Sequence, residues 1–258
     1  MLVTVEPNNI QCLRDTFAEI EKSNVFIEAF WMEPVMGEGN PGVAIDPEFY
    51  KVARELTKAH GAMLLVDSIQ AGLRTNGCLS IMDYPGFETL EPPEFETFSK
   101  AINGGQFPFS VLAMNERAAH SYRIGVYGNT MTGNPRALEV ATHVLNCFDD
   151  ELRKNIVDRG LEFKQKLELL QKEYPDLATN VQGTGLLLSL ELSPEYKAYG
   201  SGSIEEYMRL HGIGVIHGGK NSLRYTPHFR VTSKEVDLIV AHTRDALLNG
   251  PRLGSQEE

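Results

Sequence analysis

Two oppositely charged residues, each at the end of an apolar run, form the first candidate site. Asp67 closes the run AMLLVD at 62–67, and Lys100 closes FETFSK at 95–100. A carboxylate removed from water needs a cationic or protonated partner. A lysine in a partly dry pocket can lose its proton and attack a carbonyl as an amine. A protonated pyridine ring beside a Schiff-base lysine meets both demands, which is the electron-sink chemistry of pyridoxal phosphate (PLP).

Each of the two residues has a plainer interpretation when it is taken alone. A carboxylate after a strand often caps a helix or forms a turn, and a single lysine is usually solvated at the surface. The pair gains weight because the segment SKAINGG follows the second apolar run and contains Gly104 and Gly105. Glycines at these positions would let the backbone approach a ligand closely.

The first half of the chain alternates short apolar runs with amphipathic stretches. The stretch at 46–61 has Asp46 as a candidate N-cap, Pro47 in its first turn and Gly61 at its exit, all typical of a helix. The predicted strands are 25–32, 62–67, 95–100 and 109–114, and the predicted helices are 46–61 and 134–148.

A strand, helix, strand rhythm predicts parallel pairing with right-handed crossovers. Parallel sheets are covered on both faces, which explains the continuous apolar runs. Ligands of such sheets bind outside the carboxyl ends of the strands. Asp67 and Lys100 are both expected at that edge.

The character of the chain changes after the helix at 134–148, and a smaller α+β domain is expected there. We therefore predict an α/β cofactor-binding domain over 1–145, mostly a parallel sheet with helices on both faces, and a small domain over 146–258. The predicted elements of the small domain are a charged helix at 151–174, a strand at 185–192, a helix at 204–211, strand-like pieces at 212–218 and 222–228, and a last helix at 233–249.

Composition limits the classes of function. The chain has 258 residues, of which 42% are hydrophobic, enough for a substantial core. Its formal net charge of −11 argues against nucleic acid or an anionic membrane as the main partner. No run has the length of a membrane span, and the first residues do not resemble a signal peptide. The seven histidines show no metal-ligand spacing, so we expect no metal site.

The three widely spaced cysteines favour a reducing compartment without a disulfide framework. We expect a cytoplasmic protein. A mitochondrial location stays open, because a further amino-terminal segment is conceivable.

Five segments, in order, resemble the class III aminotransferases of PLP fold type I. LLVDSIQAGLRTNG is similar to the family signature Asp-Glu-Val-Gln-x-Gly-x-Gly-Arg-Thr-Gly, and FSKAINGGQFP is similar to the segment around the Schiff-base lysine. Any one segment would be weak, but five in order are specific. The other three segments are EPVMGEGNPG at 33–42, GNTMTGNPRA at 128–137 and LRYTPHF at 223–229.

The resemblance implies a role for each matching cofactor residue. Lys100 would form the Schiff base with PLP and then shuttle a proton between the α-carbon and the cofactor's C4′. Asp67 would pair with the pyridinium nitrogen, and Gln70 would lie near the phenolic oxygen. Thr130 matches a residue that donates to the cofactor phosphate across a dimer interface, so a homodimer is expected.

The resemblance also implies two substrate-binding residues. Arg224 matches an arginine that receives a substrate carboxylate, and Glu38 matches the glutamate that pairs with this arginine when an amino group must enter instead. An arginine–carboxylate fork is bidentate and charge-assisted, so it selects by charge and geometry.

The chain departs from the family pattern in several places. Ser68 stands where the family usually has Glu, Leu73 where Gly is common, and His228 where a second proline is expected. The family's amino-terminal portion, with a phosphate-binding loop and a ring-stacking aromatic residue, has no counterpart in the sequence. We therefore expect a fragment, a short natural form or a piece that works with another chain, and we expect oligomerisation to cover the exposed apolar surface.

The sequence predicts a PLP-dependent transaminase that moves an amino group from an amino acid or amine to a 2-oxo acid or aldehyde. Two alternatives stay open. One is a PLP-dependent aminomutase or lyase on the same scaffold, and the other is a catalytically silent fragment or interaction subunit.

Overall fold

The computed structural model describes residues 2–130 and 132–254, and the chain divides into two compact units. The first unit consists of Met1–Pro34, Ile45–Gly72 and Cys78–Asn146. The second consists of Val35–Ala44, Leu73–Gly77 and Cys147–Glu258. Two short segments from the first half of the chain therefore belong to the second unit.

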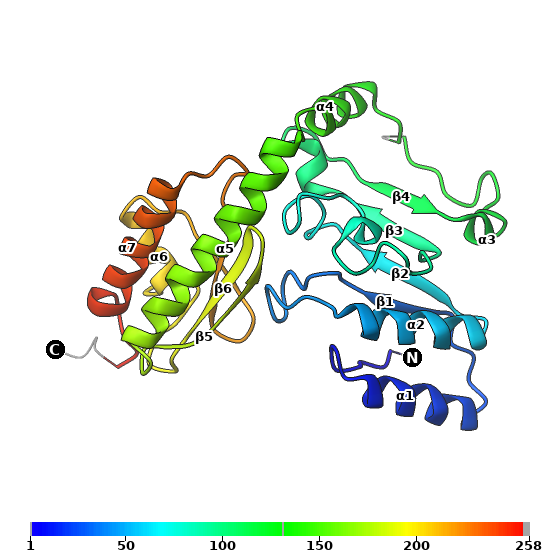
Figure 1. Cartoon of the computed structure of the whole chain (residues 1–258), viewed down its shortest axis with the longest axis horizontal. Coiled ribbons are helices and arrows are strands. Elements are labelled where there is room, and N and C mark those ends of the chain that lie inside the picture. Colours follow the sequence, from blue (N-terminus) through cyan, green and yellow to red (C-terminus); the bar gives the residue numbers. More distant parts are fainter. Residues whose placement is uncertain (1, 131, 255–258) are drawn as a thin grey trace. The chain divides into compact units, whose positions relative to one another are not determined.

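The first unit contains a four-stranded sheet with the strand order β1-β2-β3-β4 (Figure 1). Its strands are β1 (Ala29–Met32), β2 (Met63–Asp67), β3 (Phe95–Phe98) and β4 (Val111–Met114). Its helices are α1 (Ile10–Lys22), α2 (Pro47–Ala59), α3 (Glu116–Ala119) and α4 (Pro135–Asn146), with 3-10 turns η1 (Ile81–Asp83) and η2 (Lys100–Asn103).

The first three strands are parallel, as the sequence predicts, but β4 runs antiparallel to β3. The sheet is thus mostly parallel, as predicted, with one antiparallel strand. The connection from β3 to β4 holds only η2 and a loop. A parallel pair usually needs a crossover through a full helix, and this connection contains only a 3-10 turn, so the chain turns back on itself.

Helix α2 packs against β1 and β2 and buries one face of the sheet (Figure 1). Pro47 begins the helix and Asp46 takes the N-cap position, although its side chain makes no capping hydrogen bond. The buried residues Phe49, Val52 and Ala53 follow helical spacing. The predicted bounds of 46–61 are thus close to those observed.

Helix α1 does not appear among the predicted elements. Asn9 caps it by accepting a hydrogen bond from the Cys12 backbone N–H at 2.9 Å. Leu13 and Phe17 are buried four residues apart, which places both on one face. Ile10, Leu13, Phe17 and Ile20 recur at helical spacing, so the sequence carried a signal for this helix that the prediction did not use.

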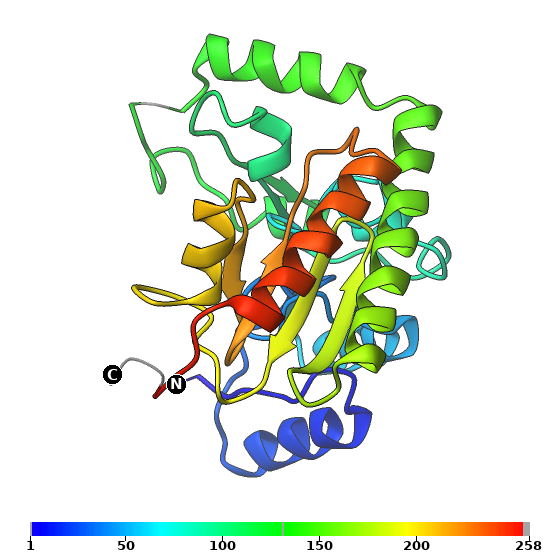
Figure 2. The same ribbon diagram turned by 90° about the vertical axis from the view of Figure 1, so that its left-hand side faces the viewer.

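The second unit is an antiparallel sheet of order β5-β6-β8-β7 with helices packed on it. Helices α5 and α7 lie side by side over one face of this sheet, as Figure 2 shows. Its strands are β5 (Ala178–Thr184), β6 (Leu187–Leu192), β7 (Ile216–Gly218) and β8 (Ser222–Tyr225), and its helices are α5 (Asp150–Glu173), α6 (Ile204–Leu210) and α7 (Ser233–Asn249).

No helix in the part of the chain that the structure describes is long and apolar enough to cross a bilayer.

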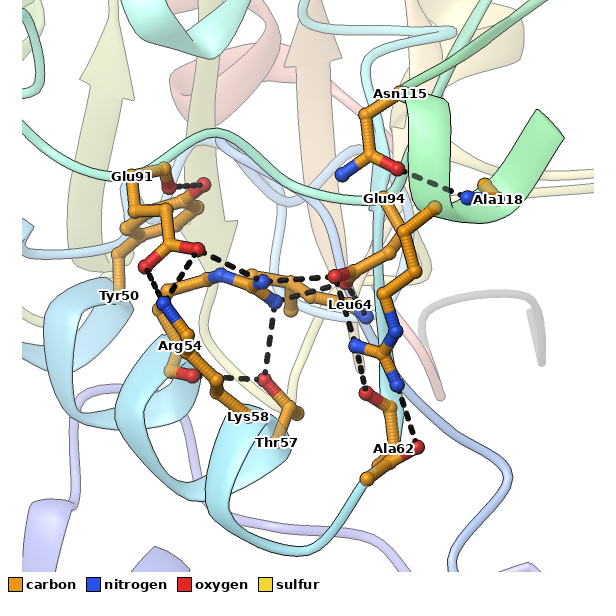
Figure 3. A network of polar contacts seen from close by, with 12 residues as sticks. Tyr50, Arg54, Thr57, Lys58, Ala62, Leu64, Glu91, Glu94, Asn115 and Ala118 are labelled. Carbon is orange, nitrogen blue, oxygen red and sulfur yellow. Dashed lines mark hydrogen bonds and ion pairs between the residues drawn. The ribbon is translucent and has the colours of Figure 1, made fainter. Parts of the chain in front are cut away.

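A buried carboxylate, Glu94, ties together three parts of the first unit (Figure 3). Both of its oxygens accept from Arg54 of α2, at 2.7 and 2.8 Å. One oxygen also accepts from the Leu64 backbone N–H at 2.7 Å, and the other accepts from Arg117 of α3 at 3.0 Å. The Glu94 side chain is fully buried, so these partners replace the water that its charge would otherwise require.

The pKa of Glu94 is lowered despite its burial. Burial alone would raise it, but the hydrogen bonds from Arg54, Leu64 and Arg117, with the positive charge of Arg54, outweigh that effect. A lowered folded-state pKa means that this carboxylate contributes stability above its unfolded pKa, near 4.5. That stability is lost as the pH falls through the folded-state value.

We predict that Glu94→Gln destabilises the protein by about 3 kcal/mol at neutral pH, because the buried Arg54 guanidinium loses its buried carboxylate partner and keeps only the partly exposed Glu91 at 3.3 Å. Urea unfolding followed by circular dichroism would measure the change. Glu48→Gln is the matched control, since the Glu48–Lys51 pair is solvent-exposed and its loss should cost at most about 0.5 kcal/mol. Equal midpoints for the two variants would contradict the prediction.

Candidate active site

Asp67 lies at the carboxyl end of β2, where the parallel sheet offers a binding edge. Its Oδ1 accepts from the Ile69 backbone N–H at 3.0 Å and from the Thr97 hydroxyl at 3.2 Å. Thr97 is the register partner of Asp67 on β3. The neighbouring strand therefore helps to hold this half-buried carboxylate in place.

Lys100 begins η2 just after β3 and has an exposed side chain. It is three residues beyond Thr97, so at most about 10 Å of chain separates the two Cα atoms. Its φ of +45° lies in the left-handed region, which is rare for a residue with a Cβ. Strained backbone of this kind persists only where the surrounding structure imposes it, and it clusters at functional sites.

The other two candidate cofactor residues also belong to the first unit. Gln70 is half-buried in the turn after β2, three residues beyond Asp67. Thr130 is exposed in the loop that precedes α4. The structure thus brings Asp67, Lys100 and Gln70 to the carboxyl ends of β2 and β3, while Thr130 lies in a loop farther along the chain.

Ser68, one of the departures from the family pattern, is buried next to the carboxylate of Glu96. The Ser68 hydroxyl donates to Glu96 at 2.6 Å, and Ser80 and the Ile81 N–H donate at 2.7 and 2.9 Å. Burial raises the pKa of Glu96, although these three hydrogen bonds partly oppose the shift. The sequence analysis missed this cluster. The sequence did contain a signal for this cluster: Glu96 alternates with Phe98 in the predicted strand and was therefore expected on the same side as that apolar residue.

The two candidate substrate residues form an ion pair within the second unit. Arg224 of β8 is buried, and its Nη1 lies 2.8 Å from Oε1 of Glu38. The same guanidinium donates to the carbonyl oxygen of Gly37, and the Gly219 N–H donates to the backbone oxygen of Glu38 at 2.7 Å. The backbone of the 35–44 segment is therefore fixed, whereas the Glu38 side chain is 63% exposed and can turn into solvent.

Arg74, for which the sequence analysis assigned no role, is held in the same unit. It donates to the carbonyl oxygen of Pro227 at 2.7 Å, and its guanidinium carbon lies 4.8 Å from the centre of the Phe229 ring. Burial, and to a smaller extent the positive charge of Arg224, lower the pKa of Arg74 to about 10.

The segment 73–77, which carries Arg74, packs into the second unit through unusual backbone geometry. Leu73 has a φ of +65°, a conformation that glycine adopts without strain, which accounts for the glycine common there in the family. Its side chain is almost completely buried, and that burial offsets part of the strain. Gly185 is required for the close approach, because a Cβ there would lie 1.8 Å from the Thr75 carbonyl oxygen.

Comparison with known proteins agrees with the sequence resemblance. A sequence model of the family described as Aminotransferase class-III matches residues 2–247. Acetylornithine aminotransferase of Xanthomonas axonopodis pv. citri is 30% identical over 81% of this chain and 50% of its own length. The protein of the same name from Nostoc sp. is 27% identical over 94% of this chain and 55% of its own length.

Solved structures show the same fold. Plasmodium falciparum ornithine delta-aminotransferase matches with a TM-score of 0.80 at 23% identity, over 95% of this chain and 61% of its own. N-acetylornithine aminotransferase of Stenotrophomonas maltophilia matches with a TM-score of 0.75 at 26% identity, again over 95% and 61%.

The chain belongs to the class III aminotransferase family and has the α/β architecture of PLP fold type I. The family expectation from the five segments is thereby confirmed. The chain spans about half the length of the curated relatives it matches.

The left-handed backbone at Lys100 leads to a stability prediction. Lys100→Gly should unfold at a higher temperature than Lys100→Ala, by an amount equivalent to about 1 kcal/mol, because only glycine adopts this φ without strain. Both variants lose the same amine, so the comparison isolates the backbone. Differential scanning calorimetry would measure the difference. A lower midpoint for the glycine variant would show that the left-handed conformation is not imposed.

Proposed function

We propose that this chain acts in PLP-dependent transamination, moving an amino group from an amino acid or amine to a 2-oxo acid or aldehyde. One observation carries the proposal. Asp67 and Lys100 follow neighbouring parallel strands, and Thr97 of the second strand hydrogen-bonds to Asp67. The family membership and the relatives named as acetylornithine aminotransferases support it.

The residues at this edge suit PLP by their chemistry. Among the described residues, both hydrogen bonds to the Asp67 carboxylate use Oδ1, so Oδ2 is available to a protonated ring nitrogen. Lys100 is exposed at the end of the adjacent strand and can present its amine to an aldehyde. Asp67 needs a cationic partner and the Lys100 amine needs a carbonyl group. PLP would supply both, as its protonated ring nitrogen and its aldehyde.

PLP, when bound, supplies an electron sink for the electrons released at the substrate α-carbon. Asp67 would hold the proton on the ring nitrogen, which keeps the ring electron-poor. Lys100 would anchor the cofactor and move the proton between the α-carbon and C4′. Gln70 would lie near the phenolic oxygen, and Thr130 would donate to the phosphate of the other subunit in a homodimer.

Arg224 would receive the substrate carboxylate, and Glu38 would control access to it. In the observed ion pair, the Arg224 guanidinium is paired with the Glu38 carboxylate and is closed to a substrate carboxylate. When Glu38 turns outward, the guanidinium becomes available as a fork for a 2-oxo acid. When the pair is closed, the arginine does not repel an incoming amino group. The relatives' names support a donor whose reacting amine is distant from its α-carboxylate.

We also place this chain in the cytoplasm, with small-molecule donors and acceptors as its partners. The net charge of −11 and the three cysteines support this location and the absence of a nucleic-acid partner. We also propose that the cofactor-binding domain spans 1–145 and that the small domain spans 146–258.

Lys100→Ala should abolish covalent attachment of PLP, measured as a borohydride-fixed adduct by mass spectrometry. Asp67→Ala should keep that adduct but lose at least about a hundredfold in turnover, because the ring nitrogen loses its charged partner. Lys51→Ala is the control, since this exposed lysine of α2 should not affect the adduct. An adduct that persists in Lys100→Ala would refute the assignment.

Glu38→Gln should favour the carboxylate-bearing substrate. Removing the competing carboxylate should lower the KM for a dicarboxylic 2-oxo acid by roughly tenfold, since a charged hydrogen bond contributes about 1.5–3 kcal/mol and a smaller part of this is expected at an exposed group. Glu195→Gln is the matched control, because Glu195 pairs with Arg252 at 2.9 Å in the same unit. Equal KM changes in the two variants would argue against control of substrate access to Arg224 by Glu38.

A further inference from the structure

Glu96 of β3 is a buried carboxylate to which the proposed function gives no role. The residue is only 6% exposed. Its Oε1 accepts from the Ser68 hydroxyl at 2.6 Å and from the Ile81 backbone N–H at 2.9 Å, and its Oε2 accepts from the Ser80 hydroxyl at 2.7 Å. Among the described residues, no lysine, arginine or histidine pairs with Glu96. Its negative charge is therefore compensated by uncharged donors alone.

The three donors lie at the two ends of one loop. Strand β2 ends at Asp67 and the 3-10 turn η1 begins at Ile81, and the residues between them form neither helix nor strand. Ser68 opens this 68–80 loop, whereas Ser80 and Ile81 lie at its far end. The carboxylate on β3 therefore joins both ends of the 68–80 loop, and a loop with joined ends has fewer conformations open to it.

The 68–80 loop is tied to two residues of the candidate active site. Asp67 immediately precedes it, and Gln70 lies in its first turn. On β3, Thr97 is the register partner of Asp67, and Glu96 is one position earlier, so the Thr97 and Glu96 side chains point to opposite faces of the sheet. Thr97 holds Asp67 from one face at 3.2 Å, and Glu96 holds the residue after Asp67 from the other. The chain at the end of β2 is thus anchored on both faces.

Glu96 makes the fold less stable when it is ionised. Burial raises the pKa of Glu96, its hydrogen bonds partly oppose this shift, and the Asp83 carboxylate adds to it. The folded state therefore binds the proton more tightly than the unfolded chain does, and stability falls as the pH rises from about 4.5 to the folded-state value. A buried group that lowers stability is expected mainly where function requires it.

The serine at position 68 fits this arrangement. The family usually has a glutamate there, but in this chain the Ser68 hydroxyl lies 2.6 Å from the Glu96 carboxylate. A glutamate at 68 would place two carboxylates side by side without a cation, which is unfavourable because like charges repel. Ser68 and Glu96 therefore act together, as one donor and one acceptor between β2 and β3.

We propose that Glu96 is a positioning residue, which closes the 68–80 loop and thereby holds Asp67 and Gln70 in place for the cofactor. Its effect on turnover rests on the proposed function, whereas the closure of the loop does not. The hydrogen bonds, and not the negative charge, hold the loop. A glutamine at 96 can make the same three contacts, because its oxygen accepts and its amide N–H donates to a serine oxygen, but an alanine makes none of them.

Amide hydrogen exchange of the full chain, measured by mass spectrometry, tests the closure of the 68–80 loop without any cofactor. The Gly72 and Gly77 N–H groups donate to carbonyl oxygens within this loop, so their protection reports its order. Glu96→Ala should raise exchange in the loop by about tenfold, and Glu96→Gln should stay within about twofold of the wild-type chain, because only the alanine loses the hydrogen bonds. Glu55→Ala is the control, since this residue of α2 is exposed.

Ser68→Ala gives a milder variant that decides the question if Glu96→Ala does not fold. It removes one of the three contacts to the carboxylate, so loop exchange should rise severalfold while the circular dichroism spectrum stays unchanged. Unchanged loop exchange in these two variants, or an equal rise in Glu96→Gln and Glu96→Ala, would overturn the closure of the loop by Glu96.

Turnover of the PLP-loaded chain tests the positioning role. Glu96→Ala should keep covalent PLP at Lys100 and the KM for the amino donor, but should lose at least about tenfold in kcat because Asp67 is displaced. Glu96→Gln should restore kcat. Faster loop exchange with an unchanged kcat would overturn the positioning role. A wild-type chain that neither attaches PLP nor turns over would refute the proposed function, while the exchange data would still decide whether Glu96 closes the loop.

Discussion

The first unit depends on how charged side chains are compensated within its mostly parallel sheet. Glu94, just before β3, is fully enclosed by two arginines and a backbone N–H. Glu96, on β3, has only neutral donors, and burial raises its pKa. Asp67, at the end of β2, has a hydroxyl and a backbone N–H on one oxygen. Compensation thus weakens toward the carboxyl ends of the strands, where a ligand can complete it.

The second unit solves a similar problem for cations. Arg74 satisfies its buried charge with a backbone carbonyl and an aromatic face, whereas Arg224 uses a carbonyl and the carboxylate of Glu38. The first arrangement is built from groups that do not move easily. The second includes an exposed side chain that can leave. Under the proposed function, this difference would suit Arg224, and not Arg74, to exchange between protein and substrate carboxylates.

Much of the fold was predictable because local signals and burial agreed. The strand at β2 and the helices α2 and α7 have apolar patterns with end signals at their termini. Strand β5 was missed because it is mostly polar, whereas α1 was missed although its apolar residues follow helical spacing. The direction of β4 depended on the absence of a crossover helix after β3, which the apolar run itself does not reveal.

The sequence indicated that Asp67 and Lys100 lie at strand ends, which the structure confirms, whereas the roles assigned to them and to the Glu38–Arg224 pair stay predictions. The supporting contacts of the site were not predictable. Glu96 and Ser68 meet because β2 and β3 pair in one register, and Arg74 contacts Pro227 across 153 positions of sequence. Contacts of that kind depend on tertiary structure, and a single sequence carries no direct signal for them.

The Arg54–Glu94 pair joins residues 40 positions apart and includes the backbone of β2 between them. Neither charge can be buried before the other arrives, because a lone buried ion is strongly unfavourable. Intermediates with α2 docked but β3 detached are therefore penalised, and this unit should open as one cooperative block. The Leu64 amide, closed by Glu94, would then exchange its hydrogen only when the whole block opens.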